Sequence, residues 1–329
     1  MTLKLGLLGA GRIGLTHARA VSALDGAAIA AVHDLLPEAA ARAAALTGAR
    51  IASAEEILDD PAIDGVMICT PTDLHADQVE MAAKAGKAIF CEKPIDLDLA
   101  RAEACVDVVE ASGVPFMLGF NRRFDPSFAA LKVHLDEGAI GKPELVQINS
   151  RDPAPPPLDY IRRSGGLFKD MMIHDFDMAR FLLGEELEIV SAAGGVLTDP
   201  MIGEAGDIDT AIVTLRSESG CLVSITNSRR ASYGYDQRIE IHGQKGMLSA
   251  ANHHANSVIL ATEAGFQSAP LLDFFMERYA QAYKAEIAAF ASFVSGRCSD
   301  VPTGRDGVAA LRLAASALAA FRQEQSRTS

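Results

Sequence analysis

Hydrophobic positions in the first 120 residues form short runs that alternate with amphipathic stretches. The runs are apolar throughout rather than at every second residue, which is typical of parallel strands covered on both faces. The intervening stretches have the spacing of helices. This alternation predicts an α/β fold with a doubly wound parallel sheet. The expected strands are residues 3–8, 27–33, 65–70, 88–92 and 114–120, and the expected helices are residues 15–23, 37–46, 54–58, 74–85 and 99–112.

The pattern of hydrophobic positions changes after about residue 120. Several strand-like runs there are joined by glycines, which predicts an antiparallel sheet. Prolines exclude helix and central strand from residues 152–157, so we expect a loop. The second part is therefore expected to be an α/β domain with a largely antiparallel open sheet. Its expected strands are residues 144–149, 208–215, 221–227, 237–242, 247–250 and 258–261, and its expected helices are residues 126–137, 168–183, 274–295 and 304–324, before a frayed tail at 325–329.

Length, charge and cysteine content narrow the functional classes. A chain of 329 residues with 49% hydrophobic content can fill two cores, and we expect domains at residues 1–120 and 121–329, with the closing helices able to pack back on the first. The net charge of −13 argues against nucleic acid, whose phosphates would be repelled. No apolar run approaches the roughly 20 residues that cross a bilayer, so we expect no membrane partner. The five cysteines form no C-x-x-C pair, which favours buried thiols in the cytoplasm over disulfides and over a catalytic thiol.

A glycine-rich turn follows the first apolar strand. Gly9 permits the tight turn, Gly11 lets a pyrophosphate approach the backbone, and Gly14 lets the next helix pack close to the strand. The N-terminus of that helix offers N–H groups and a partial positive charge to phosphates. This order predicts a nicotinamide dinucleotide site, and a similar turn without any ligand is the alternative. The residues expected at the cofactor here are Gly9, Gly11, Arg12, Ile13 and Gly14.

Asp34 lies 20 positions after Gly14, at the end of the second apolar run. A carboxylate there can accept hydrogen bonds from the ribose hydroxyls of NAD. Its charge opposes the 2′-phosphate of NADP by on the order of a few kcal/mol, and no arginine follows before Arg42 to offset it. We therefore expect NAD as the cofactor, and the alternative for Asp34 is an exposed acid in a turn.

Two further strand ends carry candidate chemistry, since ligands of open parallel sheets bind at the carboxyl ends of strands. Thr70 and Pro71 end one strand and are expected against the cofactor, with His75 at the start of the next helix. Lys93 follows the next strand, where its ammonium group could donate to a substrate hydroxyl and stabilise a developing oxyanion. A solvated lysine at a strand end is the alternative.

The stretch from Gly165 to Asp177 combines an acid with an imidazole. Asp170 and His174 are four positions apart on an expected helix, so they are predicted to share a face. A carboxylate that orients an imidazole raises its basicity, which suits a general base near neutral pH. The alternatives are a helix-surface ion pair and a metal site completed by Asp177 or His75, but we expect no metal because a third ligand with convincing spacing is missing.

These motifs resemble the Gfo/Idh/MocA family of oxidoreductases over nearly the whole chain. Glu92-Lys93-Pro94 and Asp170-x-x-x-His174 are typical of that superfamily. The stretches at residues 121–125, 151–157 and 228–230 are similar more specifically to its inositol-oxidising branch. The resemblance implies an N-terminal Rossmann domain and a C-terminal domain whose open sheet often forms a homotetramer.

The resemblance also implies a role for each matched residue. His174 would take the hydroxyl proton of the substrate, Asp170 would hold and tune His174, and Lys93 would donate to the reacting oxygen. From the residues alone, an aromatic such as Tyr235 in a sheet is usually a packing residue. Beyond the glycine turn, the residues expected at the cofactor are Asp34, Thr70, Pro71, His75, Glu92 and Lys93, and those expected at a polyol substrate are Lys93, Arg122, Asp152, Asp170, His174 and Tyr235.

The activity that the resemblance implies is NAD-dependent oxidation of a secondary hydroxyl of a cyclitol. The best match is the conversion of myo-inositol to scyllo-inosose, a step of inositol catabolism. Because the loop around Asp152 varies between relatives, scyllo-inositol, D-chiro-inositol and a sugar such as glucose stay open as substrates. A non-catalytic NAD-binding sensor is a remote alternative, because such proteins usually lose part of the catalytic set.

Overall fold

The computed structural model describes residues 2–328, which divide into two compact units. The domain boundary expected after residue 120 stays a prediction, and residues 280–311 group with the first unit in the structure. Within residues 2–328, no helix is both long and apolar enough to cross a membrane. The first unit comprises Met1–Phe124 and Ala280–Leu311, and the second comprises Asp125–Tyr279 and Arg312–Ser329.

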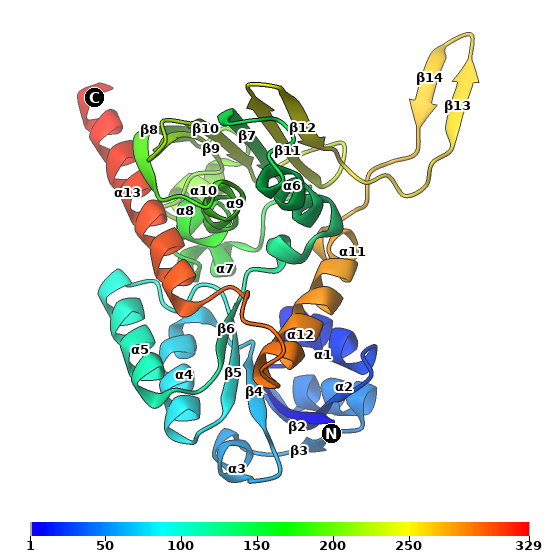
Figure 1. Ribbon diagram of the computed structural model, residues 1–329, viewed down its shortest axis with the longest axis vertical. Helices are drawn as coiled ribbons and strands as arrows, with labels where there is room; N and C mark the ends of the chain where they lie inside the picture. The colour runs from blue at the N-terminus through cyan, green and yellow to red at the C-terminus, as the bar shows by residue number, and fades with distance from the viewer. Residues whose placement is uncertain (1, 329) are drawn as a thin grey trace. The chain divides into compact units, whose positions relative to one another are not determined.

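A parallel sheet of six strands forms the centre of the first unit, in the order β3-β2-β1-β4-β5-β6 (Figure 1). The strand order reverses between β1 and β4, which confirms the doubly wound arrangement. Every residue of β4, β5 and β6 is buried, as the continuous apolar runs predicted. The strands are β1 (Leu3–Leu8), β2 (Ala27–His33), β3 (Arg50–Ile51), β4 (Gly65–Ile68), β5 (Ala88–Glu92) and β6 (Phe116–Gly119).

Helices of the first unit pack on this sheet and on one another. α1 packs on β1 and β2, and α4 packs on β4 and β5. α12 packs on α1, where the ring of His17 lies 5.3 Å from that of Tyr283. α12 also contacts β5, where the rings of Phe290 and Phe90 lie 5.7 Å apart. The helices are α1 (Arg12–Ser22), α2 (Pro37–Thr47), α3 (Ala54–Asp59), α4 (His75–Lys84), α5 (Leu99–Ser112) and α12 (Ala280–Val294), with short 3₁₀ turns η1 (Thr72–Leu74) and η2 (Asn121–Phe124).

A second six-stranded sheet, in the order β12-β11-β7-β10-β9-β8, forms the centre of the second unit. Its neighbours pair antiparallel except for β7 and β10, which are parallel, so the sheet is mixed but largely antiparallel as expected. α9 packs on β7, and α6 packs on β12 and on α9. The strands are β7 (Pro143–Arg151), β8 (Leu187–Gly195), β9 (Thr210–Ser217), β10 (Leu222–Ser228), β11 (Asp236–Gly243) and β12 (Gly246–Ala250).

The run at residues 258–261 does not join this sheet, contrary to our expectation. It becomes β13, which pairs only with β14 in a separate two-stranded hairpin that projects from the second unit (Figure 1). The remaining elements are α6 (Pro126–Asp136), α7 (Leu158–Arg163), α8 (Gly166–Asp170), α9 (Ile173–Leu183), α10 (Pro200–Glu204), β13 (Ile259–Thr262), β14 (Gly265–Ser268), α11 (Phe275–Arg278) and α13 (Gly304–Thr328), whose residues belong to both units.

The helix expected over residues 168–183 is two helices, α8 and α9, so that prediction was wrong. The backbone carbonyl of Leu167 accepts hydrogen bonds from the N–H groups of both Met171 and Met172, each at 3.0 Å. This extra bond spans five residues and offsets the second helix from the first. As a consequence Asp170 ends α8 while His174 belongs to α9, and the two do not lie one turn apart on a single helix.

Two other helix limits also differ from expectation. The helix expected over 274–295 is interrupted at Tyr279, whose ring packs 6.5 Å from Phe128 and whose hydroxyl donates to Gln237 at 3.3 Å. The tail expected to fray continues α13 as far as Thr328, and Ser329 lies outside the described residues. Arg327 in the last turn favours this extension, because a cation there complements the helix dipole.

Candidate functional site

The glycine turn between β1 and α1 has the geometry that its spacing predicted. Gly9 has a φ of 90°, and a Cβ there would lie 2.6 Å from the backbone of Cys69. A Cβ on Gly14 would lie 2.0 Å from the carbonyl oxygen of Gly9. A Cβ on Gly11 would meet no atom within 4 Å, so the space beside this residue is open. Close packing therefore requires glycine at positions 9 and 14, whereas position 11 leaves room for a ligand to approach the backbone.

The N-terminus of α1 is available to an anion. Gly11 is its N-cap and makes no side-chain capping bond, and the first turn, which begins with Arg12 and Ile13, carries no acidic residue. The exposed Arg12 adds positive charge beside the unpaired N–H groups. The turn thus fits the pyrophosphate of a dinucleotide.

Asp34 lies next to the same turn. Its carboxylate accepts hydrogen bonds from the backbone N–H of Ala10 at 2.7 Å and of Leu36 at 2.8 Å. The side chain is half-buried, and these bonds fix it beside the glycines rather than in solvent. This placement fits the ribose contact expected of Asp34.

The end of β4 is tied to the start of α4. The hydroxyl of Thr70 donates to Gln78 at 2.7 Å, while Pro71 is exposed. His75 is buried, and its ring nitrogens lie 2.8 Å from the carbonyl oxygens of Pro94 and Thr70. Burial lowers the pKa of His75, although both carbonyl contacts oppose that shift. His75 therefore connects the loop at Thr70 with the loop at Pro94. Its contact with a cofactor stays a prediction.

Lys93 follows β5 in a loop held by buried polar groups. Its backbone N–H donates to Oε2 of Glu92 at 3.3 Å, and Oε1 of Glu92 lies 2.6 Å from Nε2 of His17 on α1. The Lys93–Pro94 bond is cis. Glu92 is buried and Lys93 is half-buried. The contact between Glu92 and His17 connects the end of β5, next to Lys93, with helix α1.

Asp170 is held at both carboxylate oxygens. Oδ1 accepts a hydrogen bond from the hydroxyl of Tyr160 at 2.8 Å, and Oδ2 lies 3.4 Å from Nη1 of Arg229. Arg229 is buried, with 1% of its side chain exposed. The sequence pattern gave no signal for Tyr160, and it marked Arg229 only as part of the stretch at 228–230. His174, two residues into α9, is half-buried.

The other three residues expected at a polyol lie in different surroundings. Arg122 is buried in η2, and Asp152 follows β7, where its N–H donates to the carbonyl of Ser228 at 3.0 Å. The ring of Tyr235 is 5% exposed and packs edge-on against Phe274 at 5.8 Å, which also suits a packing role. As substrate contacts, Arg122, Asp152 and Tyr235 stay predictions.

The metal and thiol alternatives gain no support. Among residues 2–328, no group of three or more His, Cys, Asp or Glu side chains is arranged to hold a metal. All five cysteines are free thiols, and four of them are buried. Burial raises the pKa of Cys105 to about 12 and that of Cys221 to about 11. A thiolate nucleophile is therefore disfavoured at both positions.

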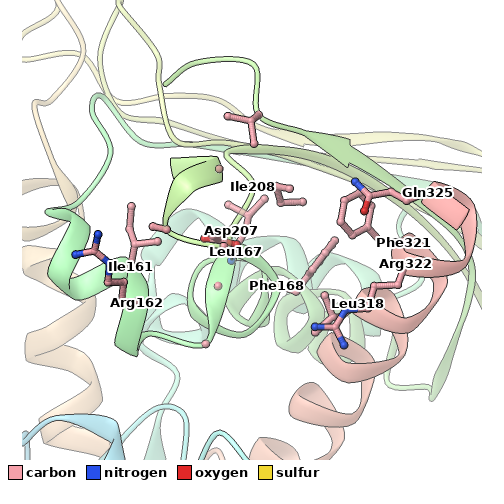
Figure 2. Close-up of a pocket in the computed structure, with 16 residues that line it drawn as sticks. Ile161, Arg162, Leu167, Phe168, Asp207, Ile208, Leu318, Phe321, Arg322 and Gln325 are labelled. Atoms are coloured by element: carbon pink, nitrogen blue, oxygen red, sulfur yellow. Dashed lines mark hydrogen bonds between the residues drawn. The ribbon is translucent and has the colours of Figure 1, made fainter. Parts of the chain in front are cut away.

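A pocket of about 420 Å³ lies in the second unit, between α7 and α8 on one side and the C-terminal part of α13 on the other (Figure 2). Asp207 and Leu167 line it, with Arg162 at one side and Phe321 and Arg322 at the other. None of the site residues expected from the sequence lines it. The predicted residues divide between the units instead: the cofactor residues, Lys93 and Arg122 belong to the first, and Asp152, Asp170, His174 and Tyr235 to the second.

Comparison with known proteins gives the same picture across the chain. Residues 3–120 match the model of the oxidoreductase family with an NAD-binding Rossmann fold, and residues 128–249 match that of the GFO/IDH/MocA C-terminal domain. The chain is 53% identical to an inositol 2-dehydrogenase of Rhizobium meliloti, over 97% of this chain and 96% of that protein. It is 44% identical to a myo-inositol 2-dehydrogenase of Thermotoga maritima, over 98% of each chain.

Among solved structures, a scyllo-inositol dehydrogenase from Lactobacillus casei with bound NAD(H) and scyllo-inositol superimposes with a TM-score of 0.92 at 32% identity, over 98% of each chain. The family models together cover most of the chain, and both curated relatives span it almost completely. The chain therefore belongs to the GFO/IDH/MocA family of oxidoreductases and carries that family's NAD-binding Rossmann domain.

Proposed function

We propose that this protein oxidises a secondary hydroxyl of a cyclitol with NAD, and that its reaction is the conversion of myo-inositol to scyllo-inosose. The observation that carries the proposal is the presence of Lys93, Asp170 and His174 together in a chain 53% identical to an inositol 2-dehydrogenase. The open space at Gly11 and the uncapped N-terminus of α1 support binding of the pyrophosphate. Asp34, fixed beside that turn, supports NAD over NADP.

Each residue of the proposed catalytic set has a separate task. The glycine turn and Asp34 would hold NAD, which would supply the acceptor for the hydride of the carbinol carbon. His174 takes the hydroxyl proton, so the carbon and oxygen form a ketone when both hydrogens have left. Asp170 orients the imidazole and stabilises the imidazolium that forms, as a carboxylate beside a catalytic histidine does. Lys93 donates to the reacting oxygen and stabilises its developing negative charge. Arg122, Asp152 and Tyr235 are proposed to contact the other hydroxyls.

The test is NADH formation, followed by absorbance, with NAD and a panel of myo-inositol, scyllo-inositol, D-chiro-inositol and glucose. We expect the highest kcat/KM with myo-inositol. A higher value with scyllo-inositol, the molecule bound in the Lactobacillus casei structure, would change the substrate but not the reaction.

The matched variants are His174→Gln and His134→Gln, because His134 is an exposed histidine on α6. His174→Gln should lower kcat by roughly 10³-fold or more and leave NAD affinity unchanged, since a general base of this kind contributes about 10²–10⁴-fold. His134→Gln should match the unmodified protein. A folded protein that binds NAD but reduces none of it with any cyclitol or sugar contradicts the proposal and favours a sensor.

We also propose that the protein forms a homotetramer and works in the cytoplasm. The five free thiols support a reducing compartment. The exposed apolar residues of the β13–β14 hairpin support association of copies, because contiguous apolar surface is usually covered by a partner.

A further inference from the structure

Arg229 places a full positive charge inside the second unit. The residue follows β10, and its backbone N–H donates to the carbonyl of Asp209 at 2.8 Å. Its side chain is 1% exposed and is among the largest fully buried side chains of the described chain. A buried guanidinium is costly unless carboxylates neutralise it, so its partners define its function.

The two arms of the guanidinium reach two different carboxylates. Nη1 lies 3.4 Å from Oδ2 of Asp170, and Nη2 lies 3.3 Å from Oδ2 of Asp207. Asp207 also accepts the N–H of Leu167 at 3.0 Å, near the start of α8. Arg229 therefore bridges a carboxylate that anchors the beginning of α8 and the carboxylate at its end.

The other oxygen of Asp170 is occupied as well. The hydroxyl of Tyr160, on α7, donates to Oδ1 at 2.8 Å. Tyr160 and Arg229, both outside α8 and α9, therefore hold the two oxygens of the Asp170 carboxylate. This support matters because Asp170 belongs to α8 and His174 to α9, so no single helix sets the relation between the two side chains.

We infer that Arg229 is a positioning residue, which fixes the carboxylate of Asp170 in the orientation that its proposed role toward His174 requires, with Tyr160 as the second support. The inference rests on the proposed function, because Asp170 has a catalytic role only there. Arg229 acts through Asp170 and needs no contact with substrate. Because a planar guanidinium can hold two carboxylates at fixed angles, lysine is a poor substitute for it.

The test compares Arg229→Met with Arg230→Met, its exposed neighbour, which donates to the carbonyl of Thr198. We expect Arg229→Met to lower kcat by about 100-fold, the cost of displacing a catalytic group by roughly 1 Å. The KM for NAD should change less than threefold, because the cofactor residues lie in the first unit. Arg229→Lys should recover about a tenth of the lost rate, since it restores the positive charge but not the two arms of the planar guanidinium. Arg230→Met should stay within threefold of the unmodified protein.

A double-mutant cycle with Asp170→Asn separates positioning from a merely structural role. If Arg229 acts through Asp170, Arg229→Met should slow the Asp170→Asn protein by less than about threefold. If the two effects multiply instead, or if Arg229→Met behaves like Arg230→Met, the inference is overturned. Should Arg229→Met fail to fold, Tyr160→Phe replaces it, with an expected loss of about three- to tenfold that disappears in the Asp170→Asn background.

The four proteins of this cycle are the unmodified protein, Arg229→Met, Asp170→Asn and the double variant. Their unfolding in urea is also measured, so that this inference can be tested separately from the proposed function. If the unmodified protein oxidises no cyclitol, the proposed function fails, while a shift of the unfolding midpoint by Arg229→Met that depends on Asp170 still supports the contact. Additive shifts in urea would overturn the inference regardless of activity.

Discussion

At the scale of single residues, Glu286 on α12 is the most unusual group in the first unit. Its side chain is fully buried, and neither carboxylate oxygen has a hydrogen-bond partner among the described residues. Burial, and then the charge of Glu92, raise the pKa of Glu286 well above its usual value. Glu92 contacts His17 and the backbone of Lys93, so the first unit holds two buried acidic side chains, one of them next to the proposed catalytic lysine.

The raised pKa makes stability depend on pH in a defined direction. Because the folded pKa of Glu286 exceeds the unfolded value of about 4.3, its favourable contribution is complete below that value and is lost as pH rises through the folded pKa. Glu286→Gln keeps the shape without the titration. We therefore expect the free energy of unfolding of this variant to rise relative to the unmodified protein as urea titrations move from about pH 5 to pH 9. Glu38→Gln, at an exposed acid of α2, is the control, and parallel curves for Glu286→Gln would show that Glu286 does not titrate in this range.

At the scale of elements, the limits predicted correctly from the sequence are those that neighbouring residues determine. The strand at residues 27–33 and the helix at 99–112 were predicted at their observed limits, because an apolar run and glycine or acidic caps specify them locally. The break between α8 and α9 was missed, since the bond from Met172 to Leu167 leaves no mark on the apolar spacing. In the glycine turn, the close packing at Gly9 and Gly14 was predicted from the spacing of the motif, while the approach of a pyrophosphate to Gly11 stays a prediction.

That turn yields a prediction which separates packing from binding. Gly14→Ala should destabilise the fold, because its Cβ would lie 2.0 Å from the carbonyl oxygen of Gly9. Gly11→Ala should leave the unfolding midpoint nearly unchanged, because its Cβ meets open space, yet weaken NAD binding by at least tenfold where the pyrophosphate approaches. Calorimetric titration with NAD and thermal unfolding measure the two effects. Gly246→Ala, whose Cβ has only an ordinary contact at 3.7 Å, is the control. Unchanged NAD affinity in Gly11→Ala would place the pyrophosphate elsewhere.

At the scale of the whole molecule, the sequence predicted both fold types and the family, but not which strand-like runs stay outside the sheets. Residues 259–262 have the composition of a strand, yet they pair with 265–268, and both segments are exposed. An isolated hairpin is marginally stable in water, and within residues 2–328 this one pairs with neither six-stranded sheet, which the apolar run alone could not predict. Likewise, the bonds of Tyr160 and Arg229 to Asp170 depend on residues 10 and 59 positions away, which no local pattern encodes.

The hairpin offers a test of the proposed tetramer. Phe266 is 88% exposed on β14, and its neighbour Gln267 points to the opposite face of the strand. Phe266→Glu should shift the sedimentation of the protein toward smaller species, whereas Gln267→Glu, with the same added charge, should not. If both variants sediment as the unmodified protein does, the hairpin makes no contact between copies.

The discontinuity of the first unit bears on how the protein is made. Its N-terminal segment ends at Phe124, but α12 and the beginning of α13 complete it only with residues 280–311. A nascent chain leaving the ribosome therefore carries an unfinished cofactor module, with His17 and Phe90 lacking Tyr283 and Phe290, until residues 280–311 are synthesised. Chaperones have a long interval in which to engage it, and a fragment cut after Phe124 would be a poor stand-alone NAD binder.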